Sequence, residues 1–246
     1  MIEAIKSFGS YVIYRTVGTV SVIRWIEWRK LLEWLQPEEG EKVLDIACGA
    51  GELSLKIAGK GCEVYGIDMS AGAIEFAGRL SERAKTPCKF GIGDAEHLPY
   101  PEEHFDKIVC SSSLEHFNDD GQALREMSRV LKPGGKVVLT VDSLTYPMSA
   151  ELKDRHRKMH FVAHYYTRET LKESLNIAGL ELRRSSYLLN SFLTDFFYKL
   201  RIRYRPATIV WLAISLFGYP VLLISDKFFG RRDAGYTLIA EAIKSN

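Results

Sequence analysis

Short apolar runs alternate with longer amphipathic runs through the middle of this chain, from residue 41 to about residue 142. A short run rich in Val and Ile is typical of a strand that is buried on both faces of a parallel sheet. A longer amphipathic run between two such strands predicts a helix that packs on the sheet. The strand-like runs are 42–47, 62–68, 88–94, 106–112 and 135–142. The alternation therefore predicts an α/β fold with a doubly wound, mostly parallel sheet.

The segments on either side of this block have a different texture. Residues 1–40 have a helical, aromatic pattern. After the block, a loop rich in His and Tyr is expected over 155–167, followed by a helix over about 168–178. Two more strand-like runs, 181–189 and 235–243, complete the pattern.

Composition limits the classes of function. A chain of 246 residues with a formal net charge of +2 suits one α/β domain with appendages and gives no reason to expect a nucleic-acid partner. The histidines do not fall at a zinc-like spacing, and no carboxylate cluster suggests a metal. No secretory signal is visible. The four cysteines form no C-x-x-C pair and are expected to be reduced core thiols of a cytosolic protein: Cys48, Cys62, Cys88 and Cys110.

A glycine-rich turn follows the first predicted strand, in VLDIACGAGELS (43–54). Gly49 and Gly51 allow the backbone to approach a ligand closely, and the helix that follows supplies unpaired N–H groups. Asp68 ends the second predicted strand, where a carboxylate can accept the hydroxyls of a ribose. Asp94 ends the third, where an acidic side chain can meet an adenine amino group. These positions predict a nucleoside-binding edge.

This block resembles the class I S-adenosylmethionine-dependent methyltransferases, in particular the small-molecule group that includes quinone, lipid and sugar methyltransferases. The resemblance covers about residues 41–142 and includes the segments 97–117 and 131–140. It implies a Rossmann-like, seven-stranded sheet whose last strand is antiparallel, with S-adenosylmethionine as cofactor. An NAD-binding domain, the alternative, requires Gly or Ala at the sixth position of the glycine motif, where this chain has Ser54.

The resemblance also implies residue roles at the cofactor. Ala47 replaces the first glycine of the family motif, a departure expected to tighten the turn slightly. Asp68 would hold the ribose, and Met69 would pack on the adenine. The complete predicted cofactor site is Asp45, Ala47, Gly49, Gly51, Asp68, Met69, Asp94 and Ala95.

The acceptor is expected at the carboxyl edge of the sheet, where open α/β folds bind ligands. His116, after the fourth strand, is the predicted catalytic base for an acceptor that must lose a proton. The alternative is that His116 only lines the pocket or bonds to its loop. His160, His164 and Tyr166 follow the fifth strand and are the predicted acceptor contacts, with loop hydrogen bonding as their alternative role.

An apolar insertion separates the last two predicted strands. Its central run, 207–225, contains no charged residue. Basic residues outnumber acidic ones on its flanks, which is typical of segments that contact anionic membranes. Because the strands on either side must meet in one sheet, a single membrane crossing is excluded, and Gly218-Tyr219-Pro220 favours a hairpin that dips into one leaflet. The alternative is an apolar helix pair that covers the pocket or forms a homodimer interface.

The sequence therefore predicts three parts. They are an N-terminal helical segment (1–40) that is a lid or faces a membrane, a methyltransferase core (41–189 and 234–246), and the insertion (190–233). The predicted function is methyl transfer to a small lipid-like acceptor, such as a quinone, isoprenoid, lipid or lipid-linked sugar, at the cytoplasmic face of a membrane. The alternatives are a methyltransferase for a soluble metabolite that dimerises through the insertion, and a non-catalytic binding module.

Overall fold

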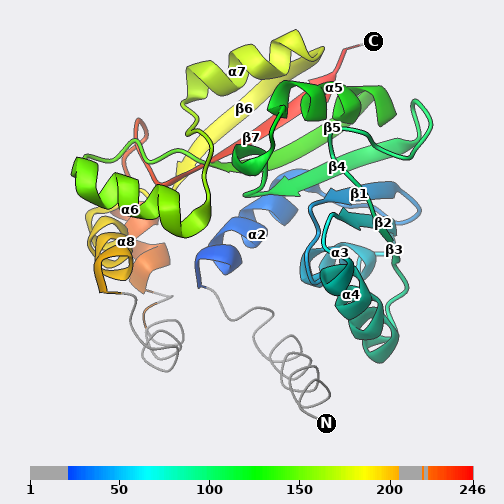
Figure 1. Ribbon diagram of the computed structural model, residues 1–246, viewed down its shortest axis with the longest axis horizontal. Helices are drawn as coiled ribbons and strands as arrows, with labels where there is room; N and C mark the ends of the chain where they lie inside the picture. The colour runs from blue at the N-terminus through cyan, green and yellow to red at the C-terminus, as the bar shows by residue number, and fades with distance from the viewer. Residues whose placement is uncertain (1–21, 205–217, 219–220, 246) are drawn as a thin grey trace.

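The computed structural model describes residues 22–204, 218 and 221–245, and it is built on one seven-stranded sheet (Figure 1). The strand order is β3-β2-β1-β4-β5-β7-β6. Strands β1 to β5 are parallel, and β7 runs antiparallel to both of its neighbours. The predicted α/β fold with an antiparallel last strand is thus confirmed. The strands are β1 (Lys42–Ile46), β2 (Glu63–Asp68), β3 (Lys89–Ile92), β4 (Phe105–Ser111), β5 (Leu131–Asp142), β6 (Leu180–Leu188) and β7 (Thr237–Lys244).

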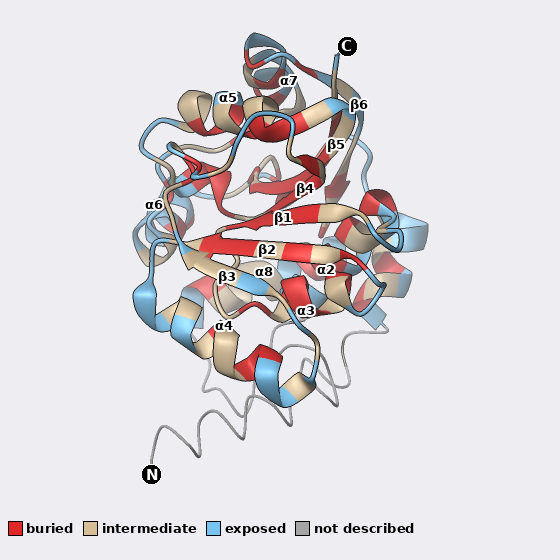
Figure 2. Cartoon of the chain, turned by 90° about the vertical axis from the view of Figure 1, so that its right-hand side faces the viewer, coloured by how far each residue is buried: buried red, intermediate tan, exposed pale blue. Residues whose placement is uncertain are grey.

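Helices cover both faces of this sheet, with α5 and α7 on one side and α2, α3 and α4 on the other (Figure 1). Their bounds are α2 (Val22–Leu35), α3 (Glu52–Ala58), α4 (Ala71–Ala84), α5 (Asp120–Val130) and α7 (Arg168–Ile177). Successive residues of β1 point to opposite faces, so Val43 packs with α2 and α3 while Leu44 packs with the layer of α5 and α7. All three of Val43, Leu44 and Ile46 are fully buried, and β1 is largely red in Figure 2. Burial on both faces explains why the strands read as continuous apolar runs.

The prediction of a loop over 155–167 is wrong for residues 155–160, because Ala150–His160 form helix α6. The Ser149 hydroxyl accepts a hydrogen bond from the Leu152 amide and caps the helix. Glu151 lies in the first turn and basic residues lie in the last, which complements the helix dipole. The helix buries Leu152 and His156, which are one turn apart.

Strand β5 begins at Leu131 rather than at residue 135, where the sequence predicted its start after a turn. Leu131 already pairs with Phe105 of β4, and the register then shifts before Lys136 pairs with Lys107. Gly134 lies in this irregular stretch with a φ of 72°. The residues between Leu131 and Lys136 therefore form an irregularity within the strand.

The insertion leaves the sheet and returns to it at the same edge, since Leu188 of β6 pairs with Thr237 of β7. It begins with helix α8 (Phe192–Tyr204), and residues 221–229 are helical. The rest of the predicted apolar run, 207–217 and 219–220, lies outside the described residues. Leu222 anchors the helical end in a buried cluster that also contains Ile26, Leu144, Tyr146, Leu189 and Tyr236. Within the described ranges, no helix combines the length and apolar character that a membrane crossing requires.

Candidate active site

The glycine-rich turn between β1 and α3 is closed by the carboxylate of Asp68. Asp68 Oδ2 accepts a hydrogen bond from the Gly49 amide at 2.9 Å, and Oδ1 accepts one from the Ser70 amide at 2.9 Å. The Cys48 amide donates to the carbonyl of Ile67 at 2.9 Å. The ends of β1 and β2 are therefore joined, with the predicted ribose-binding carboxylate at their junction.

Three backbone positions in this turn lie in the left-handed region, namely Ala47 (φ 55°), Gly49 (φ 53°) and Gly51 (φ 74°). At Gly51 a Cβ atom would approach Phe90 Cζ to 2.6 Å, so space as well as conformation requires glycine. Ala47 adopts a conformation that costs a non-glycine residue about 1–2 kcal/mol. The departure from the family motif thus places strain in the turn.

Asp45 lies beneath the turn, where it is almost fully buried. The Ser54 hydroxyl donates to Asp45 Oδ2 at 2.5 Å. Burial and, to a smaller extent, the nearby charge of Asp68 raise the pKa of Asp45 to about 7, against the lowering effect of the Ser54 hydrogen bond. Ser54 therefore has a structural role at the position where an NAD-binding motif has Gly or Ala: its hydroxyl satisfies a buried carboxyl group.

Beyond the turn, the ends of β2 and β3 present both apolar and acidic side chains. Met69 is 74% exposed and Ile92 is 63% exposed, although both are large and apolar. Ala95 is buried, and Asp94 accepts a hydrogen bond from the Glu96 amide at 2.9 Å. Exposed apolar groups suit the face of a base, and the carboxylates of Asp68 and Asp94 suit hydroxyl and amino donors. These apolar side chains and hydrogen-bond-accepting carboxylates fit the adenosyl part of S-adenosylmethionine.

A polar cavity of about 180 Å³ lies further along the same sheet edge, at the carboxyl ends of β4 and β5. It is closed by α2, α6, α8 and the short 3₁₀ helix η1 (Leu114–His116). Arg24 of α2 lines it and interacts electrostatically both with Glu27 and with Glu52, at the start of α3. Because Ile46 of β1 pairs with Cys110 of β4, the glycine turn and the cavity-lining Ser112 follow the ends of neighbouring strands. The lining residues are Ile23, Arg24, Glu27, Ser112, Glu115, His116, Asp142, His156, His160, Tyr198, Arg201 and Thr237.

Buried carboxyl groups dominate this cavity. Glu115 is fully buried, its Oε1 accepts from the Asp142 amide at 3.1 Å, and its Oε2 has no hydrogen-bond partner among the described residues. Burial and the charge of Asp142 raise the pKa of Glu115 well above its usual range. Burial and the charge of Glu27 raise the pKa of Asp142 to about 7, against the opposing effect of Arg201. The carboxyl groups of Glu115 and Asp142 are therefore at least partly protonated near neutral pH.

Glu27 connects the N-terminal helix to this site. Its carboxylate accepts hydrogen bonds from the hydroxyls of Thr237, at 3.0 Å, and Ser112, at 3.2 Å. Burial raises the pKa of Glu27. Helix α2 is thus fixed over the ends of β4 and β7 by polar contacts.

Two histidines in the cavity are neutral at pH 7. Burial lowers the pKa of His156 to about 3, and its Nε2 lies 2.9 Å from the Tyr198 hydroxyl. Burial also lowers the pKa of His116, whose Nδ1 lies 3.4 Å from the carbonyl oxygen of Phe161. Because a carbonyl oxygen only accepts, Nδ1 of His116 carries the proton and Nε2 carries the lone pair. His116 therefore has the protonation state of a base.

The structure divides the predicted acceptor contacts into two groups. His160 lines the polar cavity together with His116. His164 and Tyr166 instead meet Asp120, at the start of α5: His164 Nε2 is 3.0 Å from Asp120 Oδ2, and the Tyr166 hydroxyl donates to the same oxygen. Their predicted contact with the acceptor stays a prediction.

Sequence reasoning missed most of the polar groups in this cavity. Glu115 stands next to His116 in the segment SSLEHF, so its place in the site could be inferred from its neighbour. Glu27 lies in an aromatic helical run, where a single carboxylate reads as a surface charge. His156 fell in the expected loop. No local signal marks Glu27 or His156 as buried.

We expect the protein to be about 1 kcal/mol more stable toward unfolding at pH 6.5 than at pH 8. The folded-state pKa values of Asp45 and Asp142 are about 7, against a usual value of 3.8, so the folded state binds more protons between these limits. Stability must therefore rise as pH falls through 7. His156 opposes part of this gain from about pH 7.5 downward, because only the unfolded state protonates it there. Urea unfolding at both pH values measures the difference, and Asp45→Asn should reduce it. Equal stabilities would contradict the burial of these carboxyl groups.

Comparison with known proteins adds independent findings. A family model described as a methyltransferase domain matches residues 37–179. The chain is 40% identical over 113 residues to methyltransferase GfsG of Streptomyces halstedii, covering 45% of this chain and 41% of that protein. It is 33% identical over 129 residues to a demethylmenaquinone methyltransferase of Geobacillus sp. (strain WCH70), covering 50% and 55%. The chain thus spans about half the length of these relatives.

A solved structure agrees over most of the chain. The structure of geranyl diphosphate methyltransferase in complex with SAM matches with a TM-score of 0.68 at 18% identity. The match covers 89% of this chain and 84% of that one. At this identity it supports the fold.

Proposed function

Because the chain belongs to the methyltransferase-domain family, we propose that it transfers a methyl group from S-adenosylmethionine to a small acceptor held in the polar cavity. The observation that carries the proposal is the position of that cavity, beside the glycine turn on one edge of the sheet. S-adenosylmethionine supplies a methyl group already activated for displacement. The protein then has to orient the acceptor, exclude water and accept a proton where one is released.

The predicted cofactor residues have matching roles in this proposal. Asp68 holds the turn through two amides and retains oxygen lone pairs for hydroxyl donors. Asp45 supports the turn from below, and Met69 offers an exposed apolar surface beside it. Asp94 and Ala95 follow the end of β3 and form the adenine end of the proposed site. The whole set lies on the ends of three adjacent strands.

His116 is the proposed base. Its ring lines the polar cavity, and its Nδ1 contact with Phe161 leaves Nε2 as the proton acceptor. Glu115 and Asp142 line the same cavity, and their raised pKa values leave carboxyl groups there that can donate as well as accept hydrogen bonds near pH 7. The site therefore favours an acceptor with hydroxyl, amine or carbonyl groups.

The size of the cavity favours a ring-sized reacting group. An engineered cavity of about 150 Å³ holds a benzene molecule, so a volume of about 180 Å³ suits the headgroup of a larger molecule. The relative from Geobacillus is named for a quinone substrate. We propose a quinone-type or other lipid-like acceptor, whose headgroup enters the cavity and whose apolar part stays outside it.

The insertion is the proposed site of peripheral membrane contact, at the cytoplasmic face. Large apolar side chains are exposed along it: Phe192, Phe196, Val221, Ile224, Phe228 and Phe229. Fewer basic residues on the flanks of the insertion are available to a membrane than the sequence suggested, because Arg201 lines the polar cavity and Lys199 pairs with Asp195. Apolar burial therefore has to supply most of the membrane affinity. The same surface would serve a homodimer if the acceptor were a soluble metabolite.

Methyl-labelled S-adenosylmethionine, mass spectrometry of products and vesicle flotation test these proposals together. We expect label in a prenylated naphthohydroquinone held in anionic vesicles, and flotation of the protein with those vesicles. Labelling of a short soluble analogue alone, with no flotation and a dimer in solution, would instead support the soluble-metabolite alternative. Cofactor binding without any methylated product in lipid or metabolite extracts would support a non-catalytic module.

A further inference from the structure

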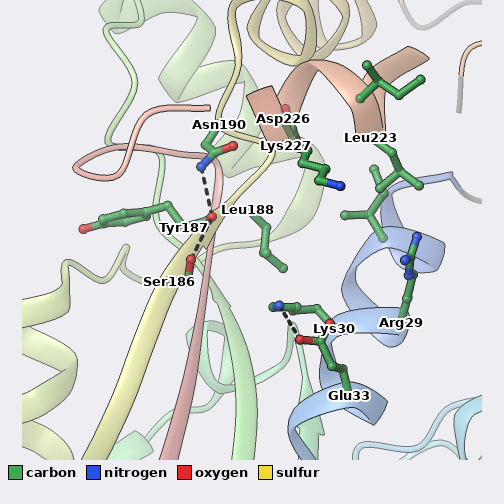
Figure 3. Close-up of a pocket in the computed structure, with 12 residues that line it drawn as sticks. Arg29, Lys30, Glu33, Ser186, Tyr187, Leu188, Asn190, Leu223, Asp226 and Lys227 are labelled. Carbon is green, nitrogen blue, oxygen red and sulfur yellow. Dashed lines mark hydrogen bonds and ion pairs between the residues drawn. The ribbon is translucent and has the colours of Figure 1, made fainter. Parts of the chain in front are cut away.

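A second cavity, of about 560 Å³, lies beside α2 (Figure 3). It is bounded by α2, by the end of β6 and by the helical residues 221–229 of the insertion. Ile26 and Arg29 of α2 line it, whereas Arg24 and Glu27 of the same helix line the polar cavity. The two cavities are therefore distinct. A volume in this range is typical of sites for small-molecule ligands.

Part of the cavity wall is apolar. Ile26 comes from α2, Leu188 from β6, and Leu223 and Ile224 from the insertion. Ile26 is buried, while Ile224 is 56% exposed, so the apolar wall runs from the interior to the surface. The exposed rings of Phe228 and Phe229 follow in the same helical segment. This arrangement suits a hydrocarbon chain that enters from an apolar surrounding.

Some charged groups that line the cavity already have partners within the protein, and others do not. Lys30 Nζ lies 2.7 Å from Glu33 Oε1 and is neutralised. The carboxyl group of Asp226 is held by the insertion itself, because its Oδ1 accepts from the Ser191 amide at 3.0 Å and from the Thr194 hydroxyl at 2.9 Å.

Arg29 and Lys227 remain as cations. Neither has a carboxylate at ion-pair distance within the part of the chain that the structure describes. Arg29 lies on α2 and Lys227 on the insertion, across the cavity from each other (Figure 3). A guanidinium and an ammonium group from opposite walls suit one phosphate group, which accepts hydrogen bonds from both.

We propose that this cavity binds an anionic phospholipid of the membrane, with its phosphate between Arg29 and Lys227 and one chain along Ile26, Leu188 and Leu223. The bound lipid is not methylated, because it lies outside the polar cavity. The proposal does not depend on the identity of the methyl acceptor. It assigns to the insertion a lipid site in addition to an exposed apolar surface.

The first test uses dodecyl phosphate, with dodecanol and inorganic phosphate as partial ligands, in calorimetric titrations of the full chain. We expect dodecyl phosphate to bind at least about tenfold more tightly than either partial ligand, because charge and chain contribute together. The double variant Arg29→Ala/Lys227→Ala should lose about tenfold or more of this affinity. Arg203→Ala/Arg232→Ala removes the same charge from other exposed positions and should bind like the wild type. Equal losses in the two double variants would overturn the phosphate assignment.

A second variant and a vesicle assay complete the test. Leu223→Trp fills the cavity and should weaken dodecyl phosphate binding without removing any charge, which keeps the proposal testable if the double variant fails to fold. Flotation with phosphatidylglycerol vesicles should exceed flotation with phosphatidylcholine vesicles, and the Arg29/Lys227 variant should lose that excess. Binding of dodecyl phosphate with no variant-dependent flotation would overturn the membrane lipid as the source. Loss of lipid binding with unchanged S-adenosylmethionine affinity would separate this site from the proposed catalytic one.

Discussion

Asp68→Ala is expected to weaken S-adenosylmethionine binding at least about tenfold, a loss of about 1.4 kcal/mol or more. The carboxylate holds the turn through the Gly49 and Ser70 amides, each at 2.9 Å, and offers its other lone pairs to the ribose in the proposed complex. Alanine removes both functions at once. Isothermal titration calorimetry of the wild type and the variant measures the effect.

Asp68→Asn is the matched control. Its amide oxygen can still accept from one backbone N–H, so we expect an affinity between those of the wild type and the alanine variant. The unfolding free energy of the apo protein should fall in the alanine variant as well, because two amides lose their acceptor. Unchanged cofactor affinity in Asp68→Ala would remove the main support for the cofactor site.

His116→Ala is expected to lower kcat about 10²-fold while leaving S-adenosylmethionine affinity nearly unchanged. His116 lines the polar cavity rather than the glycine turn, and its Nε2 is the proposed proton acceptor. Steady-state kinetics combined with calorimetry separates the two quantities.

His116→Gln distinguishes proton transfer from loop support. Glutamine can donate to the Phe161 carbonyl as the histidine does, but it cannot take up a proton at pH 7. We expect it to be as slow as the alanine variant. Wild-type turnover in either variant would make His116 a lining residue and would favour an acceptor that needs no deprotonation.

The strands and the glycine turn were predictable because their signals are local. Burial of a parallel strand on both faces requires an apolar side chain at nearly every position, as in Val43, Leu44 and Ile46. The turn requires glycine at Gly51, where even one carbon atom would meet Phe90. Such constraints are visible in a few consecutive residues, so the resemblance based on them correctly implied a seven-stranded sheet with an antiparallel last strand.

The polar cavity was predictable only in part: His116 and His160 line it, but most of its other contacts join distant parts of the chain. Glu27 pairs with Thr237 across 210 positions, and no local pattern indicates that a helix closes over the last strand. His156 is buried only because α6 packs beside α8, and the sequence had suggested a loop there. His164 and Tyr166 both contact Asp120, a partnership that the sequence did not indicate. Residue type alone does not tell which polar groups face a ligand.

Helix α2 lines both the proposed phospholipid site and the proposed acceptor site, so binding at one site can be linked thermodynamically to binding at the other. Ile26 borders the lipid cavity, and the adjacent Glu27 closes the polar cavity. If the phospholipid and the acceptor both favour the same position of this helix, each raises the affinity for the other by the same factor. The membrane would then act as an effector as well as a location, and catalytic efficiency would report on the lipid composition around the protein.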